Sequence, residues 1–407
     1  MKPRIERAIP RMQMLEQLFA RWHPEMEIEM IPLDNALNRV IAKDLYSQND
    51  LPVFRASCLD GIAVRSIDFA NGLPDTRKWK LGEDYVFADT GDDFDDAFDA
   101  VIMIENVTQT IYEPGIILVP TVTVEKGQGI RQKGEIVARG DLLVSPYTRL
   151  KPLHLALLAM GGVCQVPVLK KPRVAFIPTG NELVPMGTVP KRGENIDANS
   201  VMIEAELQNF GAEPICYPIV KDKIKQLKEV LENAVERADI VIVNAGSSMG
   251  SEDLSVDIMS ELGEVLQHGI ASAPGYPIAF AFIEHKPVIN LPGPTIAAFC
   301  GMDWAVREMV NHCLRQSKFV REVVTATLTD DLSKWPPVET YNRMFVTCEG
   351  DRYYAQPIPR HAHTSVSMAQ CNGLHIAPIG IDGYKKGQEL IVELLCMRSE
   401  IPNHNQQ

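Results

Sequence analysis

Small polar residues and carboxylates gather in three short loops of the sequence, each directly after an apolar run. The loops are PTGNEL at residues 178–183, NAGSSMGSED at 244–253 and LPGPT at 291–295. Backbone N–H groups and hydroxyls in such loops can bind phosphate, and nearby carboxylates can bind its metal. One such turn is weak evidence, because most only connect a strand to a helix. Three together favour a site for an anionic ligand.

Two carboxylates of these loops, Glu182 and Asp253, are the candidate metal ligands. They suit an octahedral magnesium ion that keeps several waters and bridges to a phosphate, although each alone would more commonly cap a helix or face solvent. No Walker A motif is present and no GxGxxG follows a strand, which counts against the common nucleotide-binding folds. The candidate ligand-binding residues of the loops are Thr179, Gly180, Gly246, Ser247, Ser248, Gly250, Pro292, Gly293 and Thr295.

The elements that carry these loops alternate between strand and helix. RVAFIP, DIVIVN and KPVINLP are apolar and β-branched, whereas ANSVMIEAELQNF and KDKIKQLKEVLENAVERA have helical periodicity. This alternation predicts a central doubly wound parallel α/β domain over residues 172–316. Ligands of such sheets bind outside the carboxyl ends of the strands, so the three loops are expected at one edge.

The rest of the chain predicts three further parts of a multi-domain α/β plus β protein. Short β-branched runs with Gly, Pro and Asp turns indicate an inserted β domain over residues 51–139. Residues 1–50 and 140–171 form a helical and linking domain around this insertion. Residues 317–407 return to short strands and predict a small C-terminal β domain.

Bulk composition narrows the class of partner. The 407 residues carry a net charge of -13, which disfavours duplex nucleic acid because that binding depends on neutralising phosphates. No apolar stretch has the length of a membrane span, and the start lacks the apolar core of a signal peptide. The eight cysteines include no CxxC pair, which indicates reduced thiols and a cytoplasmic location.

Four other features favour plain structural roles. Asp60-Gly61 between apolar runs is typical of a tight hairpin turn, and the acidic run from Asp89 to Asp99 of a solvated loop. His361 and His363 would share one face of an extended segment, but no third metal ligand stands nearby. Cys58 has no basic neighbour to activate it and is interpreted as a small core residue.

The order of motifs over nearly the whole chain resembles a known family. LPVFRASCLDGIAVR, ADTG, DAVIMIEN, RQKGE, GDLLV, PTGNEL, IDANS, NAGSSMGSED, APGYP and LPGPTIAAF follow one another as in the molybdopterin molybdenumtransferases, or molybdenum insertases, which include the gephyrin E domain. The resemblance implies an elongated homodimer of four-domain subunits with its active site between subunits. It also implies magnesium-dependent hydrolysis of adenylylated molybdopterin, coupled to transfer of molybdate onto the dithiolene and release of AMP.

The resemblance assigns roles to individual residues. It implies a catalytic set of four carboxylates and a role for the threonine of the T-G motif and the serine of the long loop in binding. The matching residues are Asp60 in S-x-x-D-G, Thr90 in T-G, Glu182 in T-G-D-E-L, Asp222 before the long helix, and Ser248 and Asp253 in G-G-x-S-x-G-x-x-D.

Several positions of these motifs depart from the family pattern. Two lysines of K-P-G-K-P are replaced by Ala273 and Tyr276, and the carboxylate of G-E-D-I by Ile136. Losing cations and a carboxylate at an anionic site lowers the expected binding of ligand and transition state. The other departures are Asn181 for aspartate, Ala245 for glycine, and Pro294 and Thr295 in place of the N-P of L-P-G-N-P.

Two functions remain open at this point. The first is a divergent but active insertase, or a transferase for a related pterin cofactor. The alternative is a non-catalytic or altered-specificity protein that carries a molybdopterin-type cofactor. A basic residue in the ligand cleft would favour the first, and a cleft without cations the second. The expected partners are a second copy of the chain, a small anionic pterin, and a molybdopterin adenylyltransferase or a molybdoenzyme.

Overall fold

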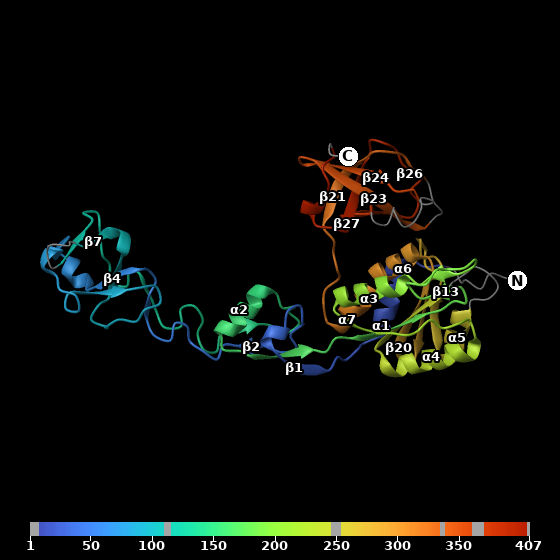
Figure 1. Ribbon diagram of the computed structural model, residues 1–407, viewed down its shortest axis with the longest axis horizontal. Coiled ribbons are helices and arrows are strands. Elements are labelled where there is room, and N and C mark those ends of the chain that lie inside the picture. Colours follow the sequence, from blue (N-terminus) through green and yellow to red (C-terminus); the bar gives the residue numbers. More distant parts are fainter. Residues whose placement is uncertain (1–7, 110–114, 246–253, 334–337, 360–369, 405–407) are drawn as a thin grey trace. The chain divides into compact units, whose positions relative to one another are not determined.

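The computed structural model describes residues 8–109, 115–245, 254–333, 338–359 and 370–404 (Figure 1). These residues form two compact units. Unit 1 comprises Met1–Met26 with Lys170–Gln407, and unit 2 comprises Glu27–Leu169. Within the described ranges no helix is both long and apolar enough to cross a membrane.

One part of unit 2 is built from the two ends of its chain segment. Strand β1 (Ile28–Pro32) pairs antiparallel with β11 (Gln165–Leu169), and β2 (Leu45–Tyr46) pairs with β10 (Leu142–Val144). Helix α2 (Pro152–Met160) starts at a proline, which suits the first helical position. Its core includes Ile41, Leu150, Leu158, Val166 and Val168.

The other part of unit 2 is all β. Strand β4 (Gly61–Val64) lies between β5 (Tyr85–Ala88) and β6 (Ala100–Met103), antiparallel to both. Short pairs add β3 (Ala56–Ser57) to β9 (Ile130–Arg131) and β7 (Val107–Gln109) to β8 (Ile116–Leu118). Separate apolar clusters, around Ile62 and around Ala63, cover the two faces of β4.

Gly61 opens this central strand, so the interpretation of Asp60-Gly61 as a hairpin turn is wrong. A Cβ on Gly61 would lie 1.9 Å from the carbonyl oxygen of Ile102 on β6. Only glycine therefore allows β4 and β6 to approach this closely. The glycine did mark a special backbone position, but the cause is the close packing of two strands and not a turn.

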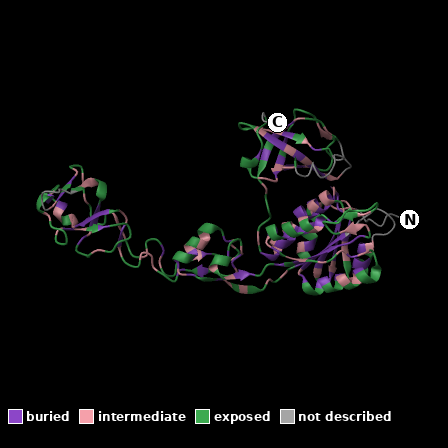
Figure 2. Ribbon diagram, in the orientation of Figure 1, coloured by how far each residue is buried: buried purple, intermediate pink, exposed green. Residues whose placement is uncertain are grey.

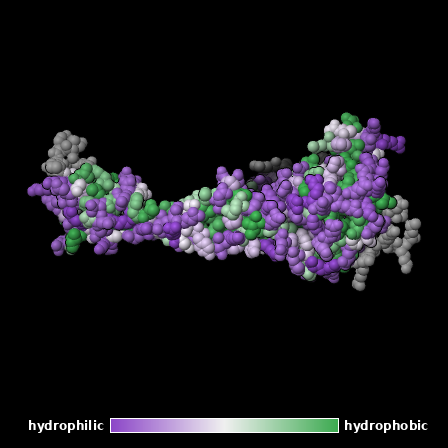
Figure 3. Space-filling view, turned by 90° about the horizontal axis from the view of Figure 1, so that it is seen from below, coloured by the Kyte–Doolittle hydropathy of each residue, from purple (hydrophilic) through white to green (hydrophobic). Residues whose placement is uncertain are grey.

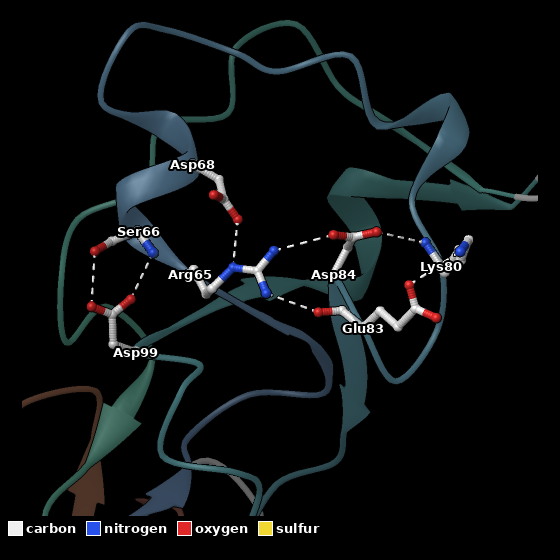
Figure 4. Close-up of polar contacts among 7 residues, drawn as sticks. All are labelled: Arg65, Ser66, Asp68, Lys80, Glu83, Asp84 and Asp99. Carbon is white, nitrogen blue, oxygen red and sulfur yellow. Dashed lines mark hydrogen bonds and ion pairs between the residues drawn. The ribbon is translucent and has the colours of Figure 1, made fainter.

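Arg65, directly after β4, organises the loops at that end of the strand (Figure 4). Its guanidinium donates to the carboxylates of Asp68 and Asp84 and to the carbonyl oxygen of Glu83. Asp99 accepts from the backbone N–H and hydroxyl of Ser66, at 2.6 and 2.9 Å. Most of the acidic run is exposed, as expected, but Asp99 fixes a loop.

Unit 1 contains a six-stranded sheet in the order β15-β12-β16-β20-β19-β17. Four neighbours run parallel: β15 (Glu213–Cys216), β12 (Arg173–Pro178), β16 (Ile240–Ala245) and β20 (Lys286–Pro292). The expectation of a wholly parallel sheet is wrong for β19 (Ala279–Ile283) and β17 (Glu264–His268), which are antiparallel to their neighbours.

The physical reason is a two-residue hairpin between β19 and β20. Its turn residues, Glu284 and His285, both have positive φ, 49° and 66°. Turns of this kind match the twist of antiparallel strands but are usually marked by Asn-Gly or Asp-Gly. Glu-His carries no such signal, so the hairpin was not expected.

Helices cover both faces of this sheet (Figure 1): α4 (Ile224–Arg237) and α5 (Leu254–Leu262) on one, α3 (Asn199–Phe210) and α6 (Thr295–Gly301) on the other. Buried residues concentrate along the strands (Figure 2). Gly211 ends α3 with a φ of 92°, a common helix stop. Helix α1 (Arg11–Arg21) precedes this part, and α6 continues through a π-helical turn (Met302–Val306) into α7 (Arg307–Cys313).

A second six-stranded sheet of unit 1 has the order β18-β23-β24-β21-β27-β25, and all of its strands except β18 come from the C-terminal residues. An added β23–β25 pairing closes five of these strands into a barrel. The sixth, β18 (Ser272–Ala273), lies between β17 and β19 in the chain and pairs parallel with β23 (Glu339–Glu349). The other strands are β21 (Val323–Leu328), β24 (Arg352–Pro357), β25 (Gly373–Ala377) and β27 (Glu389–Leu394).

A buried ionic cluster connects this barrel to the helices. Asp303, in the π-helical turn, accepts hydrogen bonds from Arg307 and from both terminal nitrogens of Arg321, just before β21. The side chains of Asp303 and Arg321 are 5% and 9% exposed. The Arg307 guanidinium lies between the rings of Phe210 and Phe319, 4.3 and 4.2 Å from their centroids.

Candidate functional site

The three small-residue loops follow strands that are direct neighbours. Strands β12, β16 and β20 are parallel, with Pro178 opposite Asn244 and Ala245 opposite Pro292. Their carboxyl ends therefore meet at one edge of the sheet. The expectation that the PTGNEL and LPGPT loops lie at this edge is confirmed.

A cleft of about 460 Å³ lies at that edge. Four predicted ligand residues line it: Thr179, Glu182, Gly293 and Thr295. Gly180 and Pro292 are their direct neighbours in the backbone. The remaining described lining residues are Leu183, Asn195, Ile196, Asp197, Ala198, Asn199, Asn244 and Pro294. These twelve include no lysine or arginine.

Two buried asparagines, missed by sequence analysis, connect the walls of the cleft. Asn244 ends the apolar part of β16, and its Nδ2 donates to the carbonyl oxygens of Leu291 and Pro292 at 3.2 and 2.8 Å. Asn199 opens α3, and its Nδ2 donates to Asn244 Oδ1 at 2.8 Å and to Gly293 O at 2.7 Å. An asparagine closing so apolar a strand was the available signal.

Residues of the loop before α4 hold the PTGNEL turn through hydrogen bonds. Gly180 N–H donates to Val220 O, and the Lys221 ammonium donates to the carbonyl oxygens of Asn181 and Leu183 at 3.1 and 3.0 Å. A Cβ on Gly180 would lie 2.7 Å from both Glu182 carboxylate oxygens. Glycine at this position therefore lets the Glu182 side chain fold back over the turn.

Asp222 is exposed and does not belong to the described wall of the cleft. Its carboxylate accepts from the backbone N–H of Asn181 at 3.1 Å, and its own N–H donates to Asn181 Oδ1 at 3.2 Å. This reciprocal pair fixes the turn that carries Glu182. The catalytic role of Asp222 stays a prediction.

Asp60 and Thr90 come together in unit 2, 30 residues apart in the chain. Asp60 Oδ1 accepts from the backbone N–H of Thr90 at 2.7 Å and from its hydroxyl at 2.8 Å. These two bonds, the backbone one first, lower the pKa of the Asp60 carboxyl below its ordinary value. The exposed Asp60 is thus held as an oriented carboxylate.

Several predicted site residues lie outside the described residues: Gly246, Ser247, Ser248, Gly250 and Asp253. His361 and His363, for which a structural role was expected, also lie outside them. Within the described ranges no group of three His, Cys, Asp or Glu side chains could hold a metal ion. Magnesium commonly uses only one or two carboxylates plus phosphate and water. Glu182, which lines the cleft, fits such a partial site.

The departing positions are spread over different places. Pro294 and Thr295 line the cleft. Ala273 and Tyr276 belong to the segment between β17 and β19 and are not among the described lining residues. Ile136 lies in unit 2 and is 48% exposed. Asn181 forms the pair with Asp222, and Ala245 ends β16.

Three known families match successive parts of this chain. Residues 6–162 match "MoeA N-terminal region (domain I and II)", residues 175–312 match "Probable molybdopterin binding domain", and residues 325–395 match "MoeA C-terminal region (domain IV)". The middle match contains the three parallel strands and the cleft.

Curated relatives and solved structures match over almost the whole length. The molybdopterin molybdenumtransferase of Staphylococcus aureus (strain MSSA476) is 30% identical over 389 residues, 89% of this chain and 90% of the relative. That of Bacillus subtilis (strain 168) is 29% identical, covering 92% and 91%. The molybdopterin biosynthesis MoeA protein of Pyrococcus horikoshii has a TM-score of 0.79 at 30% identity, covering 96% of this chain and all of that one.

Proposed function

Since the chain belongs to the molybdopterin molybdenumtransferase (MoeA) family of molybdenum cofactor biosynthesis, we propose that its cleft binds adenylylated molybdopterin for molybdate insertion. The reaction transfers molybdate onto the dithiolene and releases AMP. The observation that carries this proposal is the convergence of β12, β16 and β20 on one cleft lined by Glu182. The same match makes the protein a transferase.

The residues of the chain divide this task between orientation and charge. Thr179, Gly293 and Thr295 shape the cleft with small side chains and hydroxyls, so that the backbone can approach the ligand. Asp60, kept ionised by Thr90, provides an oriented carboxylate for a proton or a water molecule. Asn181 and Asp222 hold the turn that positions Glu182.

Magnesium is the metal we propose for this reaction. Glu182 would supply one carboxylate in the cleft, and Asp253 is the second predicted ligand. When bound with the ligand's phosphates, the ion would neutralise charge on the phosphoanhydride. Asp253→Ala is expected to lower the affinity for magnesium, measured by titration, while leaving thermal stability nearly unchanged.

We further propose that the chain works as a homodimer in the cytoplasm. Unit 2 exposes apolar side chains that a partner could cover, among them Leu153, Met30 and Leu142 at 83%, 60% and 52% exposed. Figure 3 shows hydrophobic patches within a mostly hydrophilic face. Sedimentation at micromolar concentration tests the assembly, and a monomer would contradict it. A molybdopterin adenylyltransferase or a molybdoenzyme is the proposed protein partner.

The described cleft lining contains no lysine or arginine, which by itself would favour a carrier. Lys221 lies behind the PTGNEL turn and is bound to carbonyl oxygens. The relatives are nevertheless named as transferases, and no comparison favours the carrier. We therefore expect slow catalysis in place of none.

Release of AMP from adenylylated molybdopterin in the presence of molybdate and magnesium tests the function. The wild type should release AMP above background, and Asp60→Asn should abolish this because it removes the carboxylate charge. A matched control is Asp96→Asn, an exposed carboxylate of the same unit that pairs with Arg55. If wild type and Asp60→Asn release AMP at the same background rate, the catalytic function is refuted and the carrier function takes its place.

A further inference from the structure

The two buried asparagines of the cleft have fixed amide orientations. Asn244 Nδ2 faces two carbonyl oxygens, of Leu291 and Pro292, which can only accept. Its Oδ1 must therefore face Asn199. The Asn199 amide is fixed in turn, since its Nδ2 serves two acceptors, Asn244 Oδ1 and Gly293 O. We call these linked bonds the amide relay.

The relay leaves one acceptor over. Asn199 Oδ1 is buried and has no hydrogen-bond partner among the described contacts, while Asn199 itself is only 7% exposed and lines the cleft. A buried carbonyl oxygen without a partner is unfavourable, so a hydrogen-bond donor brought to it by a ligand would be stabilised. Reversing the amide would not help, because Nδ2 would then lose two acceptors to satisfy one atom.

Its surroundings define what the acceptor can bind. The described lining offers carboxylates and amides, with no lysine or arginine. Asp197, also in the wall, has both carboxylate oxygens engaged by the backbone N–H and hydroxyl of Ser200. An acceptor in such a wall repels phosphate oxygens and attracts a neutral N–H or O–H donor.

We propose that Asn199 Oδ1 is a specificity-determining acceptor that receives a hydrogen bond from a neutral donor of the ligand. This rests on the proposed function. The ligand bears such donors in two places: the amino group of the pterin ring, and the ribose hydroxyls of the adenylyl group. Both share the chemistry that the acceptor selects.

Asn199 therefore acts through binding and touches no reacting bond. A site built around a buried acceptor rejects an analogue that lacks the donor, because the acceptor then stays unpaired. The discrimination should be about tenfold or more. This discrimination arises from the position of Asn199 Oδ1 in the amide relay. It should therefore depend on Asn199 and be independent of charges elsewhere in the cleft.

Binding to the full-length protein, with two pairs of probes, tests this. The first pair is pterin and pteridin-4(3H)-one, which lacks the amino group but keeps the lactam. The second is AMP and 2′,3′-dideoxy-AMP, which lacks both ribose hydroxyls. The wild type should prefer the donor-bearing member of one pair by about tenfold or more, and that pair identifies the source of the donor.

Asn199→Ala should remove this preference, leaving a ratio near one. Asn209→Ala is the matched control, because Asn209 is an exposed residue of the same helix and should leave the preference intact. If Asn199→Ala does not fold, Asn199→Ser takes its place, since a hydroxyl can still donate within the relay but is shorter.

Three results would overturn the proposal: no preference in either pair by the wild type, a preference that Asn199→Ala or Asn199→Ser retains, or no binding of pterin and AMP at all. AMP release by the wild type is judged separately. An active wild type with no donor preference would refute the role of Asn199 and leave the proposed function standing.

Discussion

Asp303→Asn is expected to destabilise unit 1 strongly, because the Asp303 carboxylate neutralises two buried guanidinium groups. Arg321 is 9% exposed and Arg307 15% exposed, and both donate to Asp303. Arg321 also forms an ion pair with Glu393, at 3.5 Å, whose side chain is 34% exposed. Removing one partner of such a buried cluster typically costs about 3–5 kcal/mol, because charge is left buried without compensation.

The free energy of unfolding is measured by urea titration, followed by tryptophan fluorescence, to which Trp304, next to Asp303 and 6% exposed, contributes together with the three other tryptophans. Asp331→Asn is the control: both side chains of its ion pair with Lys385 are exposed, so little loss of stability is expected. The double variant Asp303→Asn with Arg321→Met should be less destabilised than the sum of its single changes, since the unpaired charge is removed.

A loss of less than about 1 kcal/mol for Asp303→Asn would refute this reasoning. It would mean that Glu393 or solvent compensates the two arginines. Strictly additive effects in the double variant would contradict it in a second way, because they would show that Asp303 and Arg321 contribute independently.

Three further predictions concern single residues. Thr90→Val should raise the pKa of Asp60 towards its ordinary value by removing the hydroxyl donor while keeping the backbone one, so the acidic limb of the pH–rate profile should move to higher pH; an unmoved limb would assign it to another group. The sign follows because the hydrogen bonds lower the pKa of Asp60 in the folded protein. The ionised carboxylate is lost when the pH falls through that pKa, so a higher pKa means that it is lost at a higher pH. Gly61→Ala should prevent unit 2 from folding normally, because the Cβ meets Ile102 O at 1.9 Å, whereas Gly91→Ala, with open space at its Cβ, should cost only about 1–2 kcal/mol for its positive φ; equal thermal stability of the two variants would speak against the close approach. Tyr276→Lys should raise the affinity for adenylylated molybdopterin, measured by titration, and high salt should abolish this increase because it screens the added charge. An affinity equal to that of wild type would place Tyr276 away from the ligand's charges.

Sequence patterns predicted the elements whose signals are local. Helix α3 ends where Gly211 suggested, and the apolar runs before the PTGNEL and LPGPT loops are the parallel strands β12 and β20, which lie on either side of β16. The edge at which these loops meet follows from parallel pairing alone. The contact between Asp60 and Thr90 required the antiparallel pairing of β4 with β5, which places residue 61 opposite residue 88.

What could not be predicted depends on tertiary contacts. The hairpin at Glu284 and His285 lacks the residues that usually mark such turns, so two antiparallel strands were missed. The amide relay was missed because Asn199 and Asn244 are 45 residues apart and each is unremarkable alone. Asp222 carries a suitable carboxylate for catalysis, yet its contacts in the described structure are to the Asn181 backbone and amide. A residue type shows what chemistry is available, whereas its neighbours decide what it does.

The pairing of β18 with β23 bears on whether the C-terminal barrel could be exchanged between proteins as a module. Ser272 and Ala273, which pair with Glu339 and Thr340, precede the barrel's own first strand by about 50 residues in the chain and sit between two strands of the other sheet. A fragment beginning after α7 would lack them and would expose the backbone donors and acceptors of Glu339 and Thr340 as an unpaired strand edge, a site for self-association. Recombination at the boundary near residue 317 would therefore separate two halves of one hydrogen-bonded ladder, so the barrel and the α/β sheet are expected to be inherited together.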